Sequence, residues 1–364
     1  MNTLGGLVGG RAIVICCGSG GVGKTTTAAA IALGAAREGR RACVVTIDPA
    51  RRLADALGLE SLTNTPGLVE GPWPGELWAL MLDTKGTFDD LVNRYAADPS
   101  QAESILANRV YRNLSSALSG TQEYMASEKV YELHEEGRFD LVVVDTPPTR
   151  NALDFIDAPR RLLRFLDNRM FRLVMTPTRA YLRAAGWATR TFLRTVSKVV
   201  GAEVVEDAVA FFQAFEGMEE GFRARATGVR ELLASEETAF LLVASPRSDT
   251  VAEALFFADK LAEASLTVDA LVVNRLHPRF GEDAAVGGGE DGNRGGEAVA
   301  DGEALGVLEA NLADLRAVAE REEANFATLA ERVEPAPVTR VPFLASDVHD
   351  LDGLAQIAEH LFGV

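Results

Sequence analysis

The strongest constraint on the fold is a glycine-rich loop near the start of the chain. Residues Gly18–Thr25 read Gly-Ser-Gly-Gly-Val-Gly-Lys-Thr and match the pattern G-x-x-x-x-G-K-[ST]. The apolar run Arg11–Cys17 before the loop predicts a buried strand, and Thr26–Ala36 after it predicts a helix. The glycines let the backbone curl so that its N–H groups point inward at the amino end of that helix, where anions are favoured. The pattern therefore predicts a strand–loop–helix unit that binds phosphate.

The chemistry predicted for this loop is the binding of ATP together with Mg²⁺. Lys24 should reach the β- and γ-phosphates, which makes it a predicted catalytic residue as well, and the Thr25 hydroxyl should ligate the metal. The predicted binding residues of the loop are Gly18, Ser19, Gly20, Gly21, Val22, Gly23, Lys24, Thr25 and Thr26.

The same segment also fits the dinucleotide-binding pattern G-x-G-x-x-G, at Gly18, Gly20 and Gly23. Asp48, which follows the next apolar run, could then bind a ribose. That interpretation leaves the Lys-Thr pair at the end of the loop and the later Asp145 without a role. We therefore favour the phosphate-binding loop of ATPases.

Asp145 ends the apolar run Leu141–Val144, which predicts a second buried strand. An acidic residue at this place in such a site is expected to hold Mg²⁺ through water. The alternative is an aspartate that only caps the following helix.

The rest of the chain alternates short β-branched runs with longer helical patterns, which predicts an α/β fold with a doubly wound, mostly parallel sheet. The predicted strands are Arg11–Cys17, Arg41–Ile47, Glu76–Leu82, Asp140–Asp145, Phe240–Ala244, Leu266–Val273 and Pro337–Val341.

We expect three parts. Residues 1–150 and 238–364 should form the P-loop core, and 151–237, which has helical periodicity only, should be a helical insertion. Residues 281–303 are rich in glycine and acidic side chains and predict a flexible loop. After this loop, one face of a helix is marked by Leu308, Leu312, Leu315 and Val318.

The net charge of −17 argues against nucleic acid as a partner, because phosphate repels such a surface. The first residues, Met1–Gly6, lack the pattern of a signal peptide, and no apolar stretch is long enough to span a bilayer. We expect a cytoplasmic protein, with peripheral attachment to a membrane as an option.

Part of the predicted helical insertion is strongly basic, in contrast to the acidic chain as a whole. Residues 160–198 hold nine arginines and one lysine against a single acid, Asp167, with apolar residues interleaved. Basic amphipathic helices of this kind can lie on an anionic membrane or grip a client helix. The alternative is a packed helical subdomain with solvated arginines.

Five segments together resemble the deviant-Walker P-loop ATPases. They are Gly20–Thr26, Asp48–Ala50, Asp145–Thr149, Val272–Arg275 and Val341–Leu344. The last two point to the ArsA-like branch, which contains the arsenite-pump and tail-anchored-protein-targeting ATPases. The chain is most similar to actinobacterial ArsA-like ATPases that work as paired, unequal subunits.

The resemblance implies further roles. Asp48 would orient or activate the attacking water, and Asn274, Pro342 and Phe343 would cradle adenine. An Asn side chain can both donate to and accept from the adenine edge. The plainer alternatives are a strand-end Asn and an ordinary proline turn.

Departures from the family pattern limit the resemblance. The family's second lysine, which crosses a dimer interface to the partner's phosphates, is replaced by Ser19; the switch II residues read Thr149-Arg150-Asn151, and Arg51 replaces a histidine. The cysteines that clasp zinc or arsenite are absent. We therefore expect no zinc and no iron–sulfur cluster.

The function expected from these features is that of a dimeric switch that hydrolyses ATP and couples hydrolysis to client or anion handling. We expect a heterodimer with an ArsA-like paralogue that carries the missing lysine; a homodimer is the alternative. Two other interpretations stay open, a nucleotide-sensing regulatory subunit with little turnover and a MinD/ParA-like positioning ATPase.

Overall fold

The computed structural model describes residues 3–48, 52–112, 121–147, 149–167, 203, 207, 210–211, 213–280 and 302–363. Within these ranges an eight-stranded sheet has the order β3-β4-β2-β5-β1-β6-β7-β8. All neighbouring strands are parallel except β3 and β4. The strands are β1 Ile13–Cys17, β2 Arg41–Thr46, β3 Gly67–Val69, β4 Glu76–Met81, β5 Leu141–Asp145, β6 Thr238–Ala244, β7 Ala270–Leu276 and β8 Val338–Pro342.

This topology confirms the predicted α/β class, with two differences of detail. The short edge strand β3, which lies antiparallel to β4, was not predicted, because three residues are too few for a period to show. The seventh strand begins at Ala270 rather than Leu266. Asp269 marks its start, where its carboxylate accepts the backbone N–H of Phe240 at 2.8 Å.

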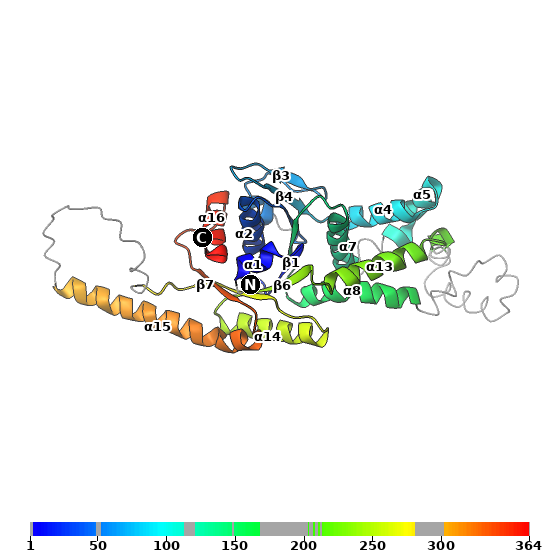
Figure 1. The fold of residues 1–364 in the computed structure, drawn as a ribbon. Coiled ribbons are helices and arrows are strands. Elements are labelled where there is room, and N and C mark those ends of the chain that lie inside the picture. The colour runs from blue at the N-terminus through cyan, green and yellow to red at the C-terminus, as the bar shows by residue number, and fades with distance from the viewer. Residues whose placement is uncertain are drawn as a thin grey trace.

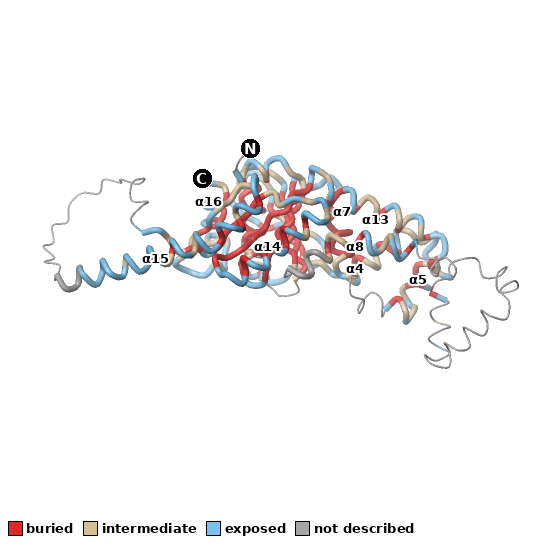
Figure 2. Tube along the Cα trace, turned by 90° about the horizontal axis from the view of Figure 1, so that it is seen from below, coloured by how far each residue is buried: buried red, intermediate tan, exposed pale blue. Residues whose placement is uncertain are grey.

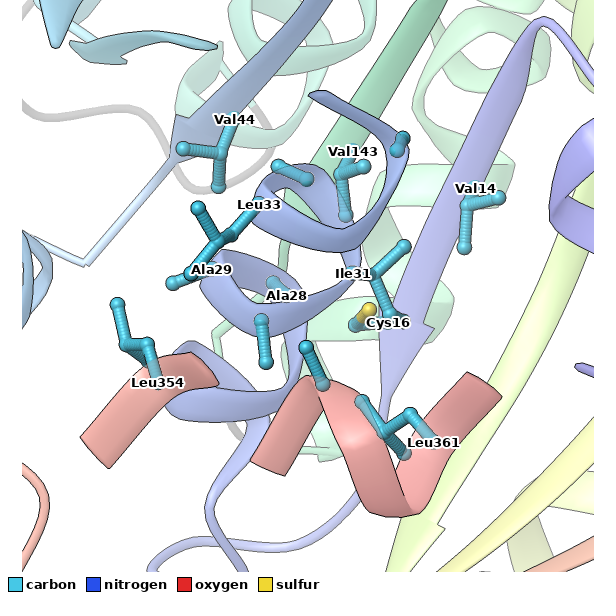
Figure 3. Close-up of a cluster of buried hydrophobic side chains, with 14 of the residues drawn as sticks. Val14, Cys16, Ala28, Ala29, Ile31, Leu33, Val44, Val143, Leu354 and Leu361 are labelled. Atoms are coloured by element: carbon cyan, nitrogen blue, oxygen red, sulfur yellow. The ribbon is translucent and has the colours of Figure 1, made fainter. Parts of the chain in front are cut away.

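Helices cover both faces of the sheet. One face carries α1 (Leu4–Gly9), α2 (Lys24–Arg37) and α16 (Leu351–Phe362). Figure 3 shows α2 between the strands and α16, with Leu33 directed toward Val44 of the sheet. The other face carries α7 (Thr121–Glu135), α8 (Thr149–Asp167), α13 (Glu219–Leu233), α14 (Ser248–Glu263) and α15 (Gly302–Arg332). The strands between them are buried on both sides, as parallel strands must be.

A second apolar cluster lies away from the sheet, among helices only. It joins α4 (Thr84–Tyr95) and α5 (Pro99–Ala107) to the outer parts of α7, α8 and α13. Figure 1 shows these helices side by side at one end of the molecule. The short helix α3 (Arg52–Ala56) follows β2. Within the predicted insertion 151–237, the parts that the structure describes hold only helix and turn, while the division of the chain into domains stays a prediction.

The predicted helix after the acidic segment is α15, but its apolar stripe is not all buried. Leu308 and Leu315 are 64% and 38% exposed, whereas Phe326 and Leu329 further along pack into the core. Figure 2 shows the exposed first half of α15 extending beyond the body. The predicted loop 281–303 lies outside the described residues except Gly302 and Glu303, which begin α15.

No helix in the described ranges combines the length and apolar character needed to cross a bilayer.

Candidate nucleotide-binding site

The predicted phosphate-binding residues lie at one edge of the sheet. The loop Gly18–Thr25 connects β1 to α2, Asp48 follows β2, and Asp145 ends β5. Strands β2, β5 and β1 are consecutive neighbours in the sheet. Because the carboxyl ends of parallel strands meet at the same edge, three segments far apart in sequence converge there.

Glycine is required at two positions of the loop. Gly18 has φ +152°, and a Cβ atom there would lie 2.1 Å from the Val243 carbonyl oxygen. Gly23 has φ +96° and a Cβ atom would lie 2.3 Å from the Asn274 amide nitrogen. Both the backbone conformation and the close approach of β6 and β7 therefore exclude larger residues. The loop is held between the ends of three strands.

Lys24 lies inside the loop. Its ammonium group donates a hydrogen bond to the Ser19 carbonyl oxygen at 2.8 Å, and the residue is 8% exposed. Burial lowers the pKa of Lys24, and the nearby Asp145 carboxylate acts against that shift. A desolvated ammonium group gains more from a phosphate anion than a solvated one does, so this placement suits phosphate binding.

Ser19 is buried at 3% exposure, and its hydroxyl has no hydrogen-bond partner among the described residues. The Ser19 side chain therefore points into the protein and carries no charge.

Asp145 is tied to the loop. Its Oδ2 accepts hydrogen bonds from the hydroxyls of Thr25 at 2.7 Å and Thr46 at 3.0 Å. Its Oδ1 is buried and has no partner in the described part of the chain. Burial raises the pKa of Asp145 to about 6, although the two hydroxyls and Lys24 act in the opposite direction.

These residues fit a magnesium ion. Mg²⁺ takes hard oxygen ligands and keeps several of its waters, and the Thr25 hydroxyl and the unpartnered Oδ1 of Asp145 offer one direct ligand and one acceptor for a bound water. A cation beside the unpartnered Oδ1 would also compensate for the burial of this carboxylate.

Asp48 lies beside these groups on the segment after β2. Its backbone N–H donates to the Thr46 hydroxyl at 3.2 Å, and its side chain is 27% exposed. The Arg52 guanidinium lies 3.7 Å from its Oδ2, one helical turn further along the chain. The carboxylate is therefore open to solvent near Lys24 and Asp145, whose pKa values its charge raises.

A cavity of about 330 Å³ adjoins the loop on the side of β7 and β8. Asn274, Pro342 and Phe343, the predicted adenine contacts, all line it, together with Gly23 and Thr26. A cavity of this volume is at the small end of the range for ligand sites. The structure thus brings the predicted phosphate and base residues into one continuous site.

Asn274 also braces the loop. Its Nδ2 donates to the Val22 carbonyl at 2.8 Å, and its Oδ1 accepts the backbone N–H of Arg275 at 2.9 Å. One amide hydrogen and one lone pair stay available for a base edge. The Phe343 ring stacks on the ring of His277, whose Nδ1 lies 2.7 Å from the Glu322 carboxylate. Phe343 is therefore held in place although it is 57% exposed.

The three cysteines are not arranged for ligand chemistry. Cys16, Cys17 and Cys43 are all buried, and burial raises the pKa values of Cys17 and Cys43 to about 12. Thiols of this kind stay protonated at neutral pH. Within the described ranges, no group of three or more His, Cys, Asp or Glu side chains is placed to hold a metal ion.

Comparison with known proteins agrees with this geometry. The family model of the anion-transporting ATPases (ArsA ATPase) matches residues 11–285, more than half of the chain. The chain belongs to the anion-transporting ATPase family. The ArsA-like relationship that the five motifs predicted is therefore confirmed at the level of the family.

Three relatives of this ATPase illustrate the range of similarity. A putative arsenical pump-driving ATPase 1 of Aquifex aeolicus is 24% identical over 96% of the chain and 78% of its own length. An ATPase ASNA1 homolog of Cryptosporidium parvum is 26% identical over 71% of the chain and 63% of the relative. The ATPase get3 of Aspergillus terreus is 30% identical over 41% of the chain and 43% of the relative. The last two matches thus span less than two-thirds of those relatives.

Sequence reasoning missed several residues that line the cavity beside the loop. They are Arg275, Leu344, Ser346, Asp347, Val348, His349 and Ile357. Arg275 could have been found, because it belongs to the Asn-Arg pair that supported the family resemblance. Leu344 likewise belongs to the segment Val341–Leu344 of that resemblance, whereas Ser346, Asp347, Val348 and His349 carry no local pattern that signals a ligand.

Proposed function

We propose that the chain binds Mg·ATP at this site, hydrolyses it to ADP and phosphate, and works as a dimeric switch whose nucleotide state controls the handling of a client or anion. The observation that carries the proposal is the 2.7 Å hydrogen bond between the Thr25 hydroxyl and Asp145. It joins the last residue of the loop to the acidic end of β5, as a site for Mg²⁺ bound to nucleotide phosphates requires. A dinucleotide site has no use for this pair.

The proposed roles follow from position. Lys24 binds the β- and γ-phosphates from within the loop. Thr25 and Asp145 would hold Mg²⁺, which would supply positive charge to the phosphates. Asp48 orients the attacking water and accepts its proton, because its carboxylate is solvent-accessible and near the loop. Asn274, Pro342 and Phe343 bind adenine in the adjoining cavity. Positioning and charge supply nearly all of the catalysis in phosphoryl transfer.

A second candidate function is favoured by Ser19. Because its side chain is buried and uncharged, the chain does not present a lysine of its own to a partner's phosphates. A homodimer would leave both of its sites without a crossing cation. We therefore infer either a heterodimer with a paralogue that carries a lysine at this position, or a subunit that senses nucleotide with little turnover.

The basic segment 160–198 is the proposed contact with a client helix or an anionic membrane surface. Residues 168–198 lie outside the described ranges. On the described part, α8, Arg160 and Arg164 are exposed, and the Phe165 ring is 52% exposed. Exposed basic and aromatic side chains on one helix suit either partner.

Substitution of the loop lysine tests the binding part of the proposal. Lys24→Ala should weaken Mg·ATP binding by roughly 100-fold or more, because the only cation of the loop is removed from a desolvated position. Isothermal titration calorimetry measures the affinity. Lys260→Ala, which removes an exposed lysine paired with Glu263 on α14, is the matched control. Equal affinity in Lys24→Ala and in the control would refute nucleotide binding at this loop.

A further inference from the structure

Arg275 occupies an irregular position in the sheet. Asn274 of β7 pairs with Val341 of β8 and Leu276 pairs with Pro342, so Arg275 is an extra residue without a pairing partner. Its φ of +65° is a conformation that residues with a side chain rarely adopt. A bulge of this kind re-aims a side chain, and backbone strain of this kind gathers at functional sites.

The bulge directs Arg275 onto the phosphate-binding loop. The side chains on either side, Asn274 and Leu276, are buried, whereas Arg275 is exposed. Its Nη1 donates a hydrogen bond to the Gly21 carbonyl oxygen at 2.9 Å. Asn274 contacts the next carbonyl of the loop, that of Val22, at 2.8 Å. The Asn-Arg pair thus holds two successive carbonyls of a loop that lies 254 and 252 residues earlier in the sequence, which rules out a local turn effect.

The guanidinium has further bonding capacity. Arginine carries five N–H donors, and the contact with Gly21 uses one of them. Among the residues that the structure describes, Arg275 forms no ion pair, and it lines the cavity that adjoins the loop. Within the loop itself Lys24 is the only cation, because position 19 is a buried serine. A positive charge with free donors therefore lies between the loop and the proposed base pocket.

We propose that Arg275 is a second nucleotide-binding cation, which contacts the phosphate chain of a nucleotide in the loop of the same subunit. The proposal rests on the nucleotide binding proposed above and deepens it. Arg275 lies on β7 of the same chain and not on a partner subunit, so it can contact the nucleotide in an isolated chain as well. A planar guanidinium suits this role because it can keep its bond to Gly21 while donating to phosphate oxygens.

The competing explanation is that Arg275 only braces the loop through Gly21. The two roles differ in their need for charge. Arg275→Gln keeps an N–H donor without charge, and Arg275→Lys keeps the charge without the fork. Arg275→Asn removes the charge and shortens the side chain, so that its amide is too short for the contact that Arg275 makes with Gly21. Asparagine tolerates a positive φ, so this variant places no new strain on the bulge. The control is Arg279→Asn, four residues further along and outside the lining of this cavity.

The experiment is calorimetric titration of each full-length variant with Mg·ADP at two salt concentrations, together with the unfolding temperature without nucleotide. We expect Arg275→Asn and Arg275→Gln to bind about 10- to 100-fold more weakly than wild type, the loss typical of a charge-assisted hydrogen bond. Their affinity should also respond less to salt. Arg275→Lys should recover part of the affinity, and the unfolding temperatures of these variants should stay close to that of wild type.

Wild-type affinity in Arg275→Gln would overturn the proposal, because a neutral donor would then suffice. Wild-type affinity in Arg275→Asn would overturn it too. A wild-type chain that binds no Mg·ADP would instead refute nucleotide binding itself, and with it both proposals, so the two failures are distinguishable.

Discussion

Asp48 has a backbone that is held by a hydrogen bond and a carboxylate that reaches solvent. The Thr46 hydroxyl anchors its backbone N–H, and Arg52 lies 3.7 Å from Oδ2. Asp145, by contrast, is buried and bonded to two hydroxyls through one oxygen. Burial thus separates the two acids into a metal-holding group and a solvent-facing group, which is the division of roles that we propose for hydrolysis.

Asp48→Asn should leave Mg·ATP binding unchanged but slow hydrolysis by about 10²- to 10⁴-fold, the usual contribution of one positioned acid–base group. Steady-state phosphate release and calorimetry measure the two quantities. The control is Asp55→Asn, which replaces an exposed acid on α3. Turnover in Asp48→Asn equal to that of the control would place the catalytic base elsewhere.

At the scale of the element, a buried ionic cluster joins α7 to α13. The Arg225 Nε atom donates to Glu128 at 2.5 Å, and Arg225 also pairs with Glu135 and lies over the Tyr131 ring. Glu128 is 2% exposed, and its Oε2 has no partner in the described ranges. Burial raises the pKa of Glu128 to about 7, and Arg225, which is shared with Glu135, offsets only part of that shift.

This cluster makes stability depend on pH. Between pH about 4.5 and 7 the folded chain keeps a proton on Glu128 that the unfolded chain has released, so the free energy of unfolding falls as pH rises through that window. The groups that face Glu128 are Arg225 from α13, Arg94 and Tyr95 from α4, and Tyr124 and Glu132 on α7.

Between pH 5 and pH 7.5, the free energy of unfolding should fall by about 1–3 kcal/mol more in wild type than in Glu128→Gln, because the glutamine does not titrate. Urea denaturation at pH 5 and pH 7.5 gives both values. Other titrating groups are common to the two proteins and cancel in the comparison. Parallel stability curves would show that Glu128 has an ordinary pKa.

The basic segment is the second element with a testable property. If residues 160–198 meet an anionic membrane, binding to liposomes should increase with phosphatidylserine content and fall with added salt, because each basic residue near the surface contributes about 1 kcal/mol that salt screens. Cosedimentation measures the fraction of the protein that is bound to liposomes. Substitution of Arg160 and Arg164 by glutamine should weaken binding. Binding that responds to neither lipid charge nor salt would favour a packed subdomain or a client protein.

At the scale of the whole molecule, the resemblance to the ArsA-like ATPases implies a crossing lysine where this chain has Ser19. Ser19 is buried, and Arg52, an arginine near the loop, already faces its own Asp48. Trans-acting cations contribute about 10³- to 10⁵-fold to rate in related phosphoryl-transfer enzymes. Arg275 improves binding in our proposal but is present whether or not a partner is bound. The missing acceleration should therefore come from another subunit.

We expect the isolated chain to hydrolyse ATP slowly and to be stimulated by a paralogue with a lysine at the position of Ser19. Turnover in the mixture should depend on Asp48 of this chain, because only its site would receive the crossing lysine. Phosphate release from mixed chains, with each aspartate replaced separately, tests this. Full activity of the isolated chain, unchanged in Arg52→Ala, would refute the paired-subunit arrangement.

Much of this fold and of its phosphate site could be predicted because the features concerned are local. Gly18 and Gly23 are needed by the backbone of one short loop, and the apolar runs that end at Cys17 and Asp145 read as buried strands by themselves. Since parallel strands align their carboxyl ends, the residues that follow them had to converge. The strand–loop–helix unit, the meeting of Asp145 with the loop, and the class of the sheet follow from these facts alone.

Tertiary structure decided what depends on contacts between distant segments. The bulge that aims Arg275 at Gly21 arises from the register of β7 against β8, and no local pattern encodes register. The pairing of Glu128 with Arg225 likewise needed α7 and α13 to pack together. In α15 the periodic stripe predicted a helix but not that Leu308 is exposed, since periodicity identifies an apolar face and only packing determines what covers it.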